Sequence, residues 1–215
     1  MINPKQELYD NIEVILKNMG ITKECYPIDS ARIVKSIPNL YLEYLPYKSS
    51  SLGAIMLRGD ITGIAVNANN SSCDQNFDIA HELIHYWLHH NVSSINLDMP
   101  SKSQNRIKEW QANEGAAQLL MPHWDFTPRF LDKAKEIERT YESVENIYYD
   151  LAKYYNVSPI VIDYRIRNLD SEILQYHSGV SIEDIKLSGN IYVFNKQKKA
   201  HIYKGLLDSL KARNG

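Results

Sequence analysis

Cysteine is scarce in this chain, with only Cys25 and Cys73 among 215 residues. Two cysteines cannot form the framework of crosslinks on which small secreted domains depend, so a reducing compartment is expected. Long apolar runs are also missing, and no stretch approaches the roughly 20 residues of a membrane-spanning helix. The first residues lack the apolar centre of a secretory signal. We therefore predict a cytoplasmic protein that does not associate with a membrane.

An excess of charge of either sign is lacking as well. The 24 lysines and arginines are balanced by 26 aspartates and glutamates, which gives a formal net charge of −2. This balance creates no global field that would attract nucleic acid. Hydrophobic residues make up 44% of the chain, enough for a real core. The length fits one domain, or one domain with a small appendage.

The most informative pattern is His-Glu-Leu-Ile-His at residues 81–85. It lies in an apolar segment without glycine or proline, which predicts a buried helix. Residues four apart share one face of a helix, so His81 and His85 can hold one metal ion. Glu82 lies beside them, where a carboxylate can take a proton from a water molecule on the metal. The alternative is two core histidines satisfied by hydrogen bonds, which would leave a buried glutamate unexplained.

A third ligand has to come from another segment. His89 follows His81 by eight residues, about 12 Å along a helix, and metal–nitrogen bonds of about 2 Å cannot span that distance. The longer metzincin signature needs glycine and histidine where the chain has Leu88 and Asn91. A downstream carboxylate is therefore expected.

A second helix is predicted at residues 104–120, before Met-Pro at 121–122. It carries a stripe of small residues that would let it approach another helix closely. The stripe consists of Ala112, Gly115 and Ala116. Glu109 precedes the stripe by three residues and shares its face, whereas Glu114 lies about 100° away and is predicted to be on the surface. We favour Glu109 over Glu114 as the third ligand.

These stretches resemble the ImmA/IrrE family of metallopeptidases. The first reads Phe-Asp-Ile-Ala-His-Glu-Leu-Ile-His at residues 77–85, and the second reads Glu-Trp-Gln-Ala-Asn-Glu-Gly-Ala-Ala-Gln-Leu-Leu-Met-Pro at residues 109–122. A third stretch, Leu-Ala-Lys-Tyr-Tyr-Asn-Val-Ser-Pro at residues 151–159, is followed by Tyr-Arg-Ile-Arg-Asn-Leu at residues 164–169. The similarity covers about residues 25–170 and does not extend into residues 171–215.

The resemblance implies a thermolysin-like site with one Zn²⁺ ion. Carried over to this chain, the ligands are His81, His85 and Glu109, and the general base is Glu82. Three protein ligands leave one position open for water, as in a catalytic zinc site. Other divalent ions could also load such a donor set. Asn113, one turn after Glu109, is a candidate for orienting a ligand, with a solvated polar residue as the alternative.

Two positions depart from the family pattern. Ile84 stands where the family usually has glycine, and Gly115 stands where it usually has phenylalanine. If the two helices touch at this point, the larger side chain on one would face the smaller one on the other. Neither departure removes a ligand.

A hydrolase of this kind also needs a donor for the tetrahedral oxyanion. The candidates are aromatic or imidazole side chains that could equally belong to the core or the surface. They are Tyr148, Tyr149, Tyr154, Tyr155 and His89.

The resemblance further implies a site-specific peptidase that cuts a helix-turn-helix repressor and so regulates transcription. One alternative is a regulatory protein with structural zinc that binds a repressor or DNA without cutting. Another is one half of a toxin–antitoxin module. Residues 147–169 have helix-turn-helix character, and Arg165 and Arg167 could meet phosphate. Two arginines are a poor footprint for DNA, and a helical corner packed on the core explains the pattern equally well.

The remaining patterns predict an α+β fold, with a small antiparallel or mixed sheet and a helical, zincin-like core that carries the histidine motif on a central helix. The expected helices are at 4–19, 29–36, 76–90, 104–120, 126–138, 141–155 and 158–168, and the expected strands are at 40–45, 53–58 and 62–68. The last two strands should pair antiparallel through Gly59-Asp60. A substrate chain is expected to add as a strand to one of those in 53–68.

Three domains are predicted. Residues 1–140 form the metallopeptidase core, residues 141–170 form the helix-turn-helix-like segment, and residues 171–215 form a C-terminal extension. Two short apolar runs at 191–194 and 200–203 flank a lysine-rich turn, as in a hairpin, and a short helix could accompany it.

Overall fold

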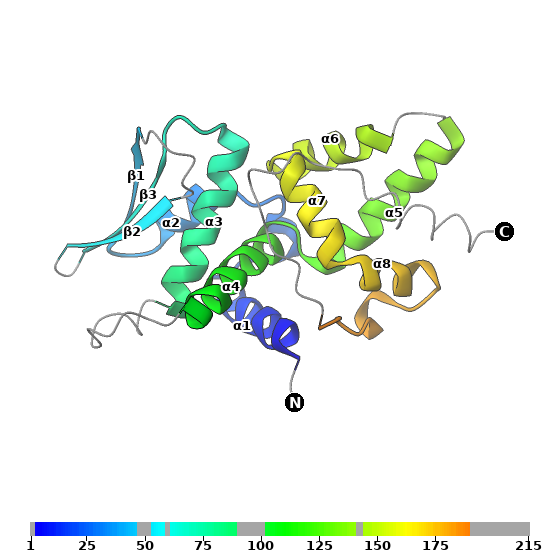
Figure 1. The fold of residues 1–215 in the computed structure, drawn as a ribbon, viewed down its shortest axis with the longest axis horizontal. Helices are drawn as coiled ribbons and strands as arrows, with labels where there is room; N and C mark the ends of the chain where they lie inside the picture. The colour runs from blue at the N-terminus through cyan, green and yellow to red at the C-terminus, as the bar shows by residue number, and fades with distance from the viewer. Residues whose placement is uncertain (1–2, 47–52, 59–60, 90–101, 141–143, 190–215) are drawn as a thin grey trace. The chain divides into compact units, whose positions relative to one another are not determined.

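The structure is a computed structural model that describes residues 3–46, 53–58, 61–89, 102–140 and 144–189 (Figure 1). Its elements are α1 (Pro4–Asn18), η1 (Lys23–Cys25), α2 (Ser30–Ser36), β1 (Leu40–Leu45), β2 (Gly53–Arg58), β3 (Ile61–Asn67), α3 (Ser72–His89), α4 (Lys102–Leu120), α5 (His123–Thr140), α6 (Val144–Tyr155), α7 (Pro159–Asn168), α8 (Asp170–His177) and η3 (Ile182–Asp184). The α+β class is confirmed. The predicted turn at Gly59-Asp60 and the predicted hairpin at 191–203 lie outside the described residues.

Contacts within the chain divide it into two compact units. One consists of residues 22–120, and the other combines residues 1–21 with residues 121–215. The sequence placed the end of the core at residue 140 instead, and that division into domains stays a prediction. The first unit contains α2, the sheet, α3 and α4, and therefore all residues predicted to form the metal site.

The sheet is mixed, in the order β1-β3-β2. The strand β2 pairs antiparallel with β3, as predicted, with Ile55 opposite Ile64. The strand β1 pairs in parallel with β3, with Leu40 opposite Thr62, so a wholly antiparallel sheet is wrong. The three consecutive residues 64–66 of β3 are fully buried. Since successive side chains point to opposite faces, both faces of the central strand are shielded from water.

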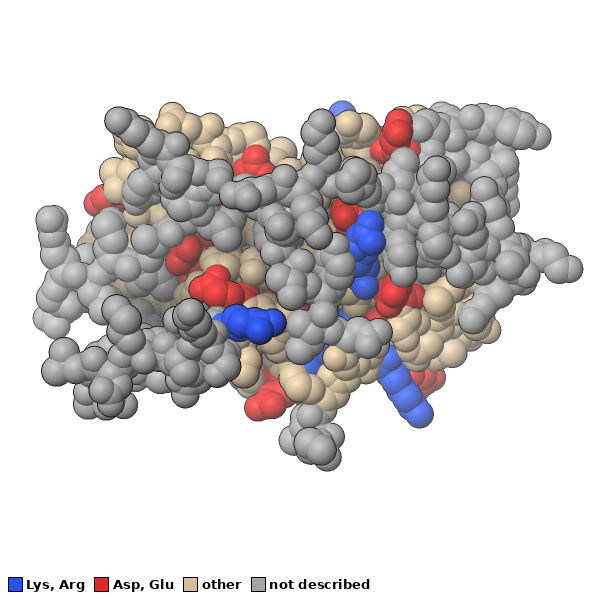
Figure 2. Space-filling view, viewed as in Figure 1, with Lys and Arg blue, Asp and Glu red and all other residues tan. Residues whose placement is uncertain are grey.

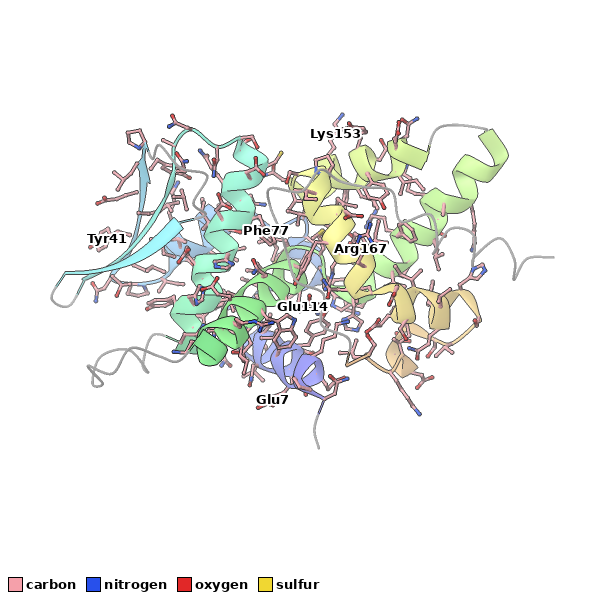
Figure 3. All side chains as sticks on the ribbon, viewed as in Figure 1. Glu7, Tyr41, Phe77, Glu114, Lys153 and Arg167 are labelled. Carbon is pink, nitrogen blue, oxygen red and sulfur yellow. The ribbon has the colours of Figure 1, made fainter. Side chains whose placement is uncertain are left out.

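The sheet positions α3. Helix α2 packs against β1, and α3 packs against α2, β2 and β3. Asn76 fastens the N-terminal half of α3 to the start of α2, because its Oδ1 accepts from the backbone N–H of Ser30 at 2.9 Å and its Nδ2 donates to the carbonyl oxygen of Ile28 at 3.3 Å. The exposed edge strand β1 presents Tyr41, which is 53% exposed (Figure 3).

Helices α3 and α4 pack closely at the position where both depart from the family pattern. A Cβ added to Gly115 would lie 3.0 Å from both Cγ1 and Cγ2 of Ile84. The predicted compensation between these two residues is confirmed. Ala112 and Ala116, the other members of the small-residue stripe, are fully buried as well. The backbone of α4 is thereby brought near enough for its side chains to reach the histidines of α3.

We expect Gly115→Phe to lower the free energy of unfolding by about 3 kcal/mol or more, because a bulky ring cannot fit beside the buried Ile84. Adding Ile84→Gly should recover at least about 1 kcal/mol, although a glycine inside a helix itself costs about that much. Chemical denaturation measures both values. Gly189→Phe is the matched control, since a Cβ at Gly189 would meet nothing within 4 Å. Equal losses at the two glycines would contradict the close helix contact.

The second unit contains the predicted helix-turn-helix as α6 and α7, which pack against each other. Asn156 makes the turn with a φ of 51°, and the backbone N–H of Val157 donates to the carbonyl oxygen of Ala152 at 3.0 Å. Helix α7 begins at Pro159 after Ser158, whose side chain makes no capping hydrogen bond. The corner therefore forms where the sequence predicts it.

The proposed phosphate contact through Arg165 is wrong. This arginine is fully buried, and it donates to the carbonyl oxygen of Met121 at 2.9 Å and to the hydroxyl of Tyr9 at 2.7 Å. Arg167 pairs with Asp163 at 3.0 Å. A buried guanidinium needs internal acceptors, and here it links α7 to α1 and to the start of the α5 segment. On the face seen in Figure 2, the lysine and arginine side chains that the structure describes lie interspersed with aspartates and glutamates.

Helix α8 was not predicted. Its Glu172 is fully buried and accepts from Nζ of Lys5 at 2.9 Å, a pair that joins α1 to α8. The sequence did not predict that Lys5 and Glu172 would be buried, because both are charged residue types with polar neighbours in the sequence. Among the residues that the structure describes, none of the helices combines the length and the hydropathy of a membrane-spanning segment.

Candidate metal centre

Three donor side chains converge between α3 and α4. The Nε2 atoms of His81 and His85 lie 3.1 Å apart, and the carboxylate oxygens of Glu109 lie 3.5 Å and 3.4 Å from them. A tetrahedron with zinc–ligand bonds of about 2.0–2.1 Å has edges of about 3.3 Å. The two nitrogens are thus spaced as two corners of such a site, and each carboxylate oxygen of Glu109 lies about one edge away from one of them. Among the residues that the structure describes, His81, His85 and Glu109 are the histidine, cysteine or acidic side chains that lie close enough together to share a metal ion.

Burial differs sharply across this triangle. The side chains of His81 and His85 are 3% and 17% exposed, whereas that of Glu109 is 58% exposed. The site is therefore deep on the α3 side and opens towards solvent beside Glu109. The imidazoles of His81 and His85 beside it hold the pKa of Glu109 well below its usual range. The carboxylate is thus in the ionised form that a metal ligand requires.

Asn113 holds the first histidine. Its Oδ1 lies 3.0 Å from Nδ1 of His81, and its Nδ2 donates to the carbonyl oxygen of Glu109 at 2.8 Å. Because the amide nitrogen is used on its own helix, the amide oxygen faces the imidazole and accepts from Nδ1. Nε2 of His81 then keeps the lone pair that points at the other donors. These contacts are compatible with the predicted orienting role of Asn113, which stays a prediction.

The second histidine continues into a longer chain of contacts. Nδ1 of His85 lies 2.9 Å from Nδ1 of His89, and Nε2 of His89 lies 3.0 Å from Oε1 of Gln111. The sequence offered His89 as a possible oxyanion donor, and the structure instead places it behind His85. Gln111 was missed altogether. A signal was present only for the contact between His85 and His89, since His89 follows His85 by four residues and so shares its face of the helix.

Glu82 lies within the same helix turn as the two histidines and is 6% exposed. Burial raises the pKa of Glu82 to about 7, with the neighbouring Glu109 and Asp78 acting in the same direction and His85 against it. A carboxyl group with a pKa near neutrality can both accept and return a proton. Asp78 itself is fully buried and accepts from Nδ2 of Asn70 at 2.8 Å.

The expectation that Glu114 is a surface residue is wrong. Glu114 is 1% exposed, and every residue from 114 to 120 is buried (Figure 3). The prediction assumed that α4 is covered on one face, whereas its C-terminal half is enclosed all round. Glu114 is nevertheless not part of the donor group found among the described residues.

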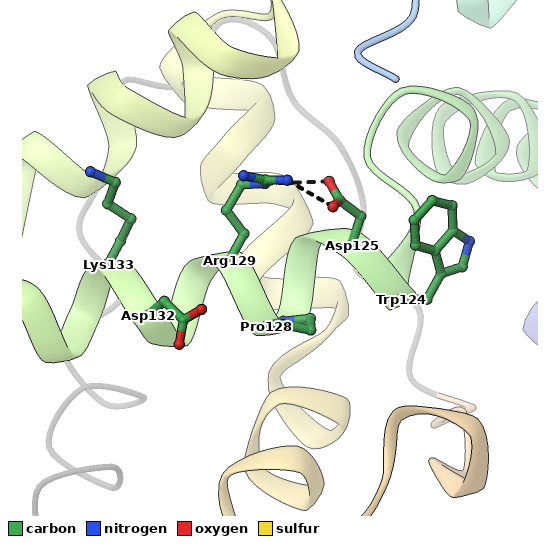
Figure 4. A pocket seen from close by; sticks show the side chains of 6 residues that line it. All are labelled: Trp124, Asp125, Pro128, Arg129, Asp132 and Lys133. Atoms are coloured by element: carbon green, nitrogen blue, oxygen red, sulfur yellow. Dashed lines mark hydrogen bonds and ion pairs between the residues drawn. The ribbon is translucent and has the colours of Figure 1, made fainter. Parts of the chain in front are cut away.

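Two of the tyrosines considered as oxyanion donors are engaged elsewhere in their own unit. The hydroxyl of Tyr155 donates to Asp125 at 2.7 Å, and that of Tyr154 accepts from Arg129 at 3.0 Å. Arg129 also pairs with Asp125 at 2.8 Å (Figure 4) and lies 3.9 Å over the ring of Tyr154. A pocket of about 310 Å³ beside this cluster is lined by Trp124, Asp125, Pro128, Arg129, Asp132 and Lys133. None of these residues belongs to the metal centre.

Comparison with known proteins agrees with this geometry. The model of a peptidase family described as the IrrE N-terminal-like domain matches residues 39–167, more than half of the chain. The matched range contains the sheet, α3 and α4, and with them each donor and each orienting residue described above. No curated protein matches the chain.

Proposed function

Because the chain belongs to the peptidase family of the IrrE N-terminal-like domain, we propose that it hydrolyses peptide bonds at a zinc ion held by His81, His85 and Glu109. The single observation that carries this proposal is the convergence of the three side chains, whose contacting donor atoms lie 3.1–3.5 Å apart. That spacing suits zinc, and the donor set of two imidazoles and one carboxylate is that of catalytic zinc sites with an open fourth position.

The residues around the site divide the chemical work. A zinc ion held there would polarise a carbonyl group and make water more acidic. Glu82 would accept a proton from the attacking water and pass it to the leaving amine. On the other side of the two rings, Nδ1 of His81 contacts Asn113 and Nδ1 of His85 contacts His89. The depth of Glu82 keeps bulk water away from the proton transfer.

We further propose that the substrate is a protein, namely a helix-turn-helix repressor, as the resemblance to the ImmA/IrrE family implies. An extended segment of it would pair with an edge of the sheet, where backbone groups provide affinity and pockets provide specificity. Of the strands considered for this role, β3 is central and has both edges occupied, whereas β2 is an edge strand. This favours β2 as the docking strand.

The test is incubation of the zinc-loaded protein with the helix-turn-helix repressor encoded beside it. We expect one or a few discrete cuts, which a chelator prevents and added Zn²⁺ restores. The same experiment addresses the alternative, in which the protein binds a repressor without cutting it. A repressor that binds the protein and stays intact with every divalent metal would support that alternative and refute the peptidase. Because Arg165 is buried, the structure gives direct DNA binding through this residue no support.

A further inference from the structure

His89 contacts His85, one of the proposed metal ligands, and does not belong to the donor group found among the described residues. Its ring nitrogens face Nδ1 of His85 and Oε1 of Gln111, at 2.9 Å and 3.0 Å. His89 is 8% exposed, so water has little access to its ring and cannot easily replace either contact. Its Nδ1 meets the outer nitrogen of His85, whereas the inner Nε2 of His85 faces His81 and Glu109. The side chains of His85, His89 and Gln111 thus form a continuous line of hydrogen-bonding contacts from α3 to α4.

We propose that His89 and Gln111 are positioning residues that fix the tautomer and the ring orientation of His85. This inference rests on the proposed zinc site and assigns the means by which one ligand is held. The Nδ1 atom of His81 contacts Asn113 of α4 directly, whereas the Nδ1 atom of His85 is connected to Gln111 of α4 through His89. Both imidazoles are thereby oriented from the helix that also supplies Glu109.

The position of each proton follows from the chemistry of the line. The Oε1 of Gln111 can only accept, so Nε2 of His89 carries a hydrogen. A neutral imidazole has one such hydrogen, and Nδ1 of His89 is therefore an acceptor. Nδ1 of His85 must then donate, which leaves the lone pair of its Nε2 free for a metal ion.

The orientation of the Gln111 amide sets the direction of the whole line. If the amide were turned round, its NH₂ group would donate to Nε2 of His89. Nδ1 of His89 would then donate to Nδ1 of His85, and Nε2 of His85 would carry the hydrogen. A protonated Nε2 cannot bind a metal ion, so the side chain at position 111 has to act as an acceptor.

The test measures zinc affinity of the full chain by competition with a chromophoric chelator. Removal of a partner of a metal-bound histidine typically costs roughly 10–100-fold in affinity. We expect that loss for His89→Leu, which offers no acceptor. His89→Asn keeps an acceptor at the place of Nδ1 and should recover most of the loss. Gln111→Glu, whose carboxylate can only accept, should bind zinc at least as tightly as the parent, and Gln111→Leu should bind it more weakly.

Asn76→Leu is the matched control, because Asn76 is a buried polar residue of the same helix whose side chain hydrogen-bonds to the start of α2. It should lower stability and leave zinc affinity unchanged. Parental zinc affinity in His89→Leu, or no recovery in His89→Asn, would overturn the positioning role.

Failure of the proposed function gives a different result, namely no zinc uptake by the parent itself. In that case the tautomer of His85 still decides the positioning role, from its ring ¹⁵N shifts in the metal-free protein. We expect the hydrogen on Nδ1 in the parent and its loss from that position in His89→Leu. A hydrogen on Nε2 of His85 in the parent would overturn the inference.

Discussion

Glu82→Gln should abolish hydrolysis and leave zinc bound. The amide keeps the shape of the carboxyl group in its buried place but cannot accept a proton. General acid–base groups typically contribute roughly 10²–10⁴-fold to a rate, and a loss in that range or larger is expected here. Cleavage is followed with the repressor substrate, and zinc content is measured on the same preparation by elemental analysis.

The cleavage rate and the zinc content together distinguish the possible roles of Glu82. Loss of cleavage with one zinc ion retained indicates a group that transfers protons. Loss of both would indicate a group that holds the metal or the fold. A variant that still cleaves at the parental rate would show that Glu82 takes no part in the reaction, despite its burial beside the histidines.

Replacing Glu109 by glutamine should remove most of the affinity for zinc. The carboxylate faces both histidines and is held in its ionised form, whereas an amide oxygen is a neutral and weaker donor. Loss of a mere partner of a ligand costs about 10–100-fold, so loss of a ligand should cost at least about 100-fold. Competition with a chelator measures this change.

Glu114→Gln is the matched control for that substitution. It makes the same chemical change five residues along α4, at a side chain that is buried but outside the donor group. Zinc affinity should stay within a few-fold of the parental value. A large loss at position 114 with none at position 109 would mean that the third ligand has been misassigned.

The parts of the site that depend on helix spacing could be predicted from the sequence. The interval of four between His81 and His85 places both rings on one face, and the small residues near Gly115 predict a close neighbour. The contact between Ile84 and Gly115 was predicted because both residues depart from the family pattern, one towards a larger and the other towards a smaller side chain. Each of these depends only on positions along one or two helices.

The features that the sequence did not predict depend on what surrounds a helix. Glutamate and arginine are normally at the surface, yet Glu114 and Arg165 are buried, and Arg165 meets residues distant in the sequence. The contact between His85 and His89 lies within one helix and was predictable in principle. The other end of the line, at Gln111, required knowledge of how α4 lies against α3.

The depth of the centre has a consequence for any folded target. Glu82 and His81 are almost wholly enclosed, and the side chain of Glu109 marks the entrance. A peptide bond inside a packed helix or sheet of another protein cannot descend to that depth. The target must first release a stretch of its chain, and the frequency of such openings is set by the target's own local stability. When opening and reclosing are fast, the proposed cleavage would follow the population of the open form, so a destabilised target would be cleaved faster with no change in this protein.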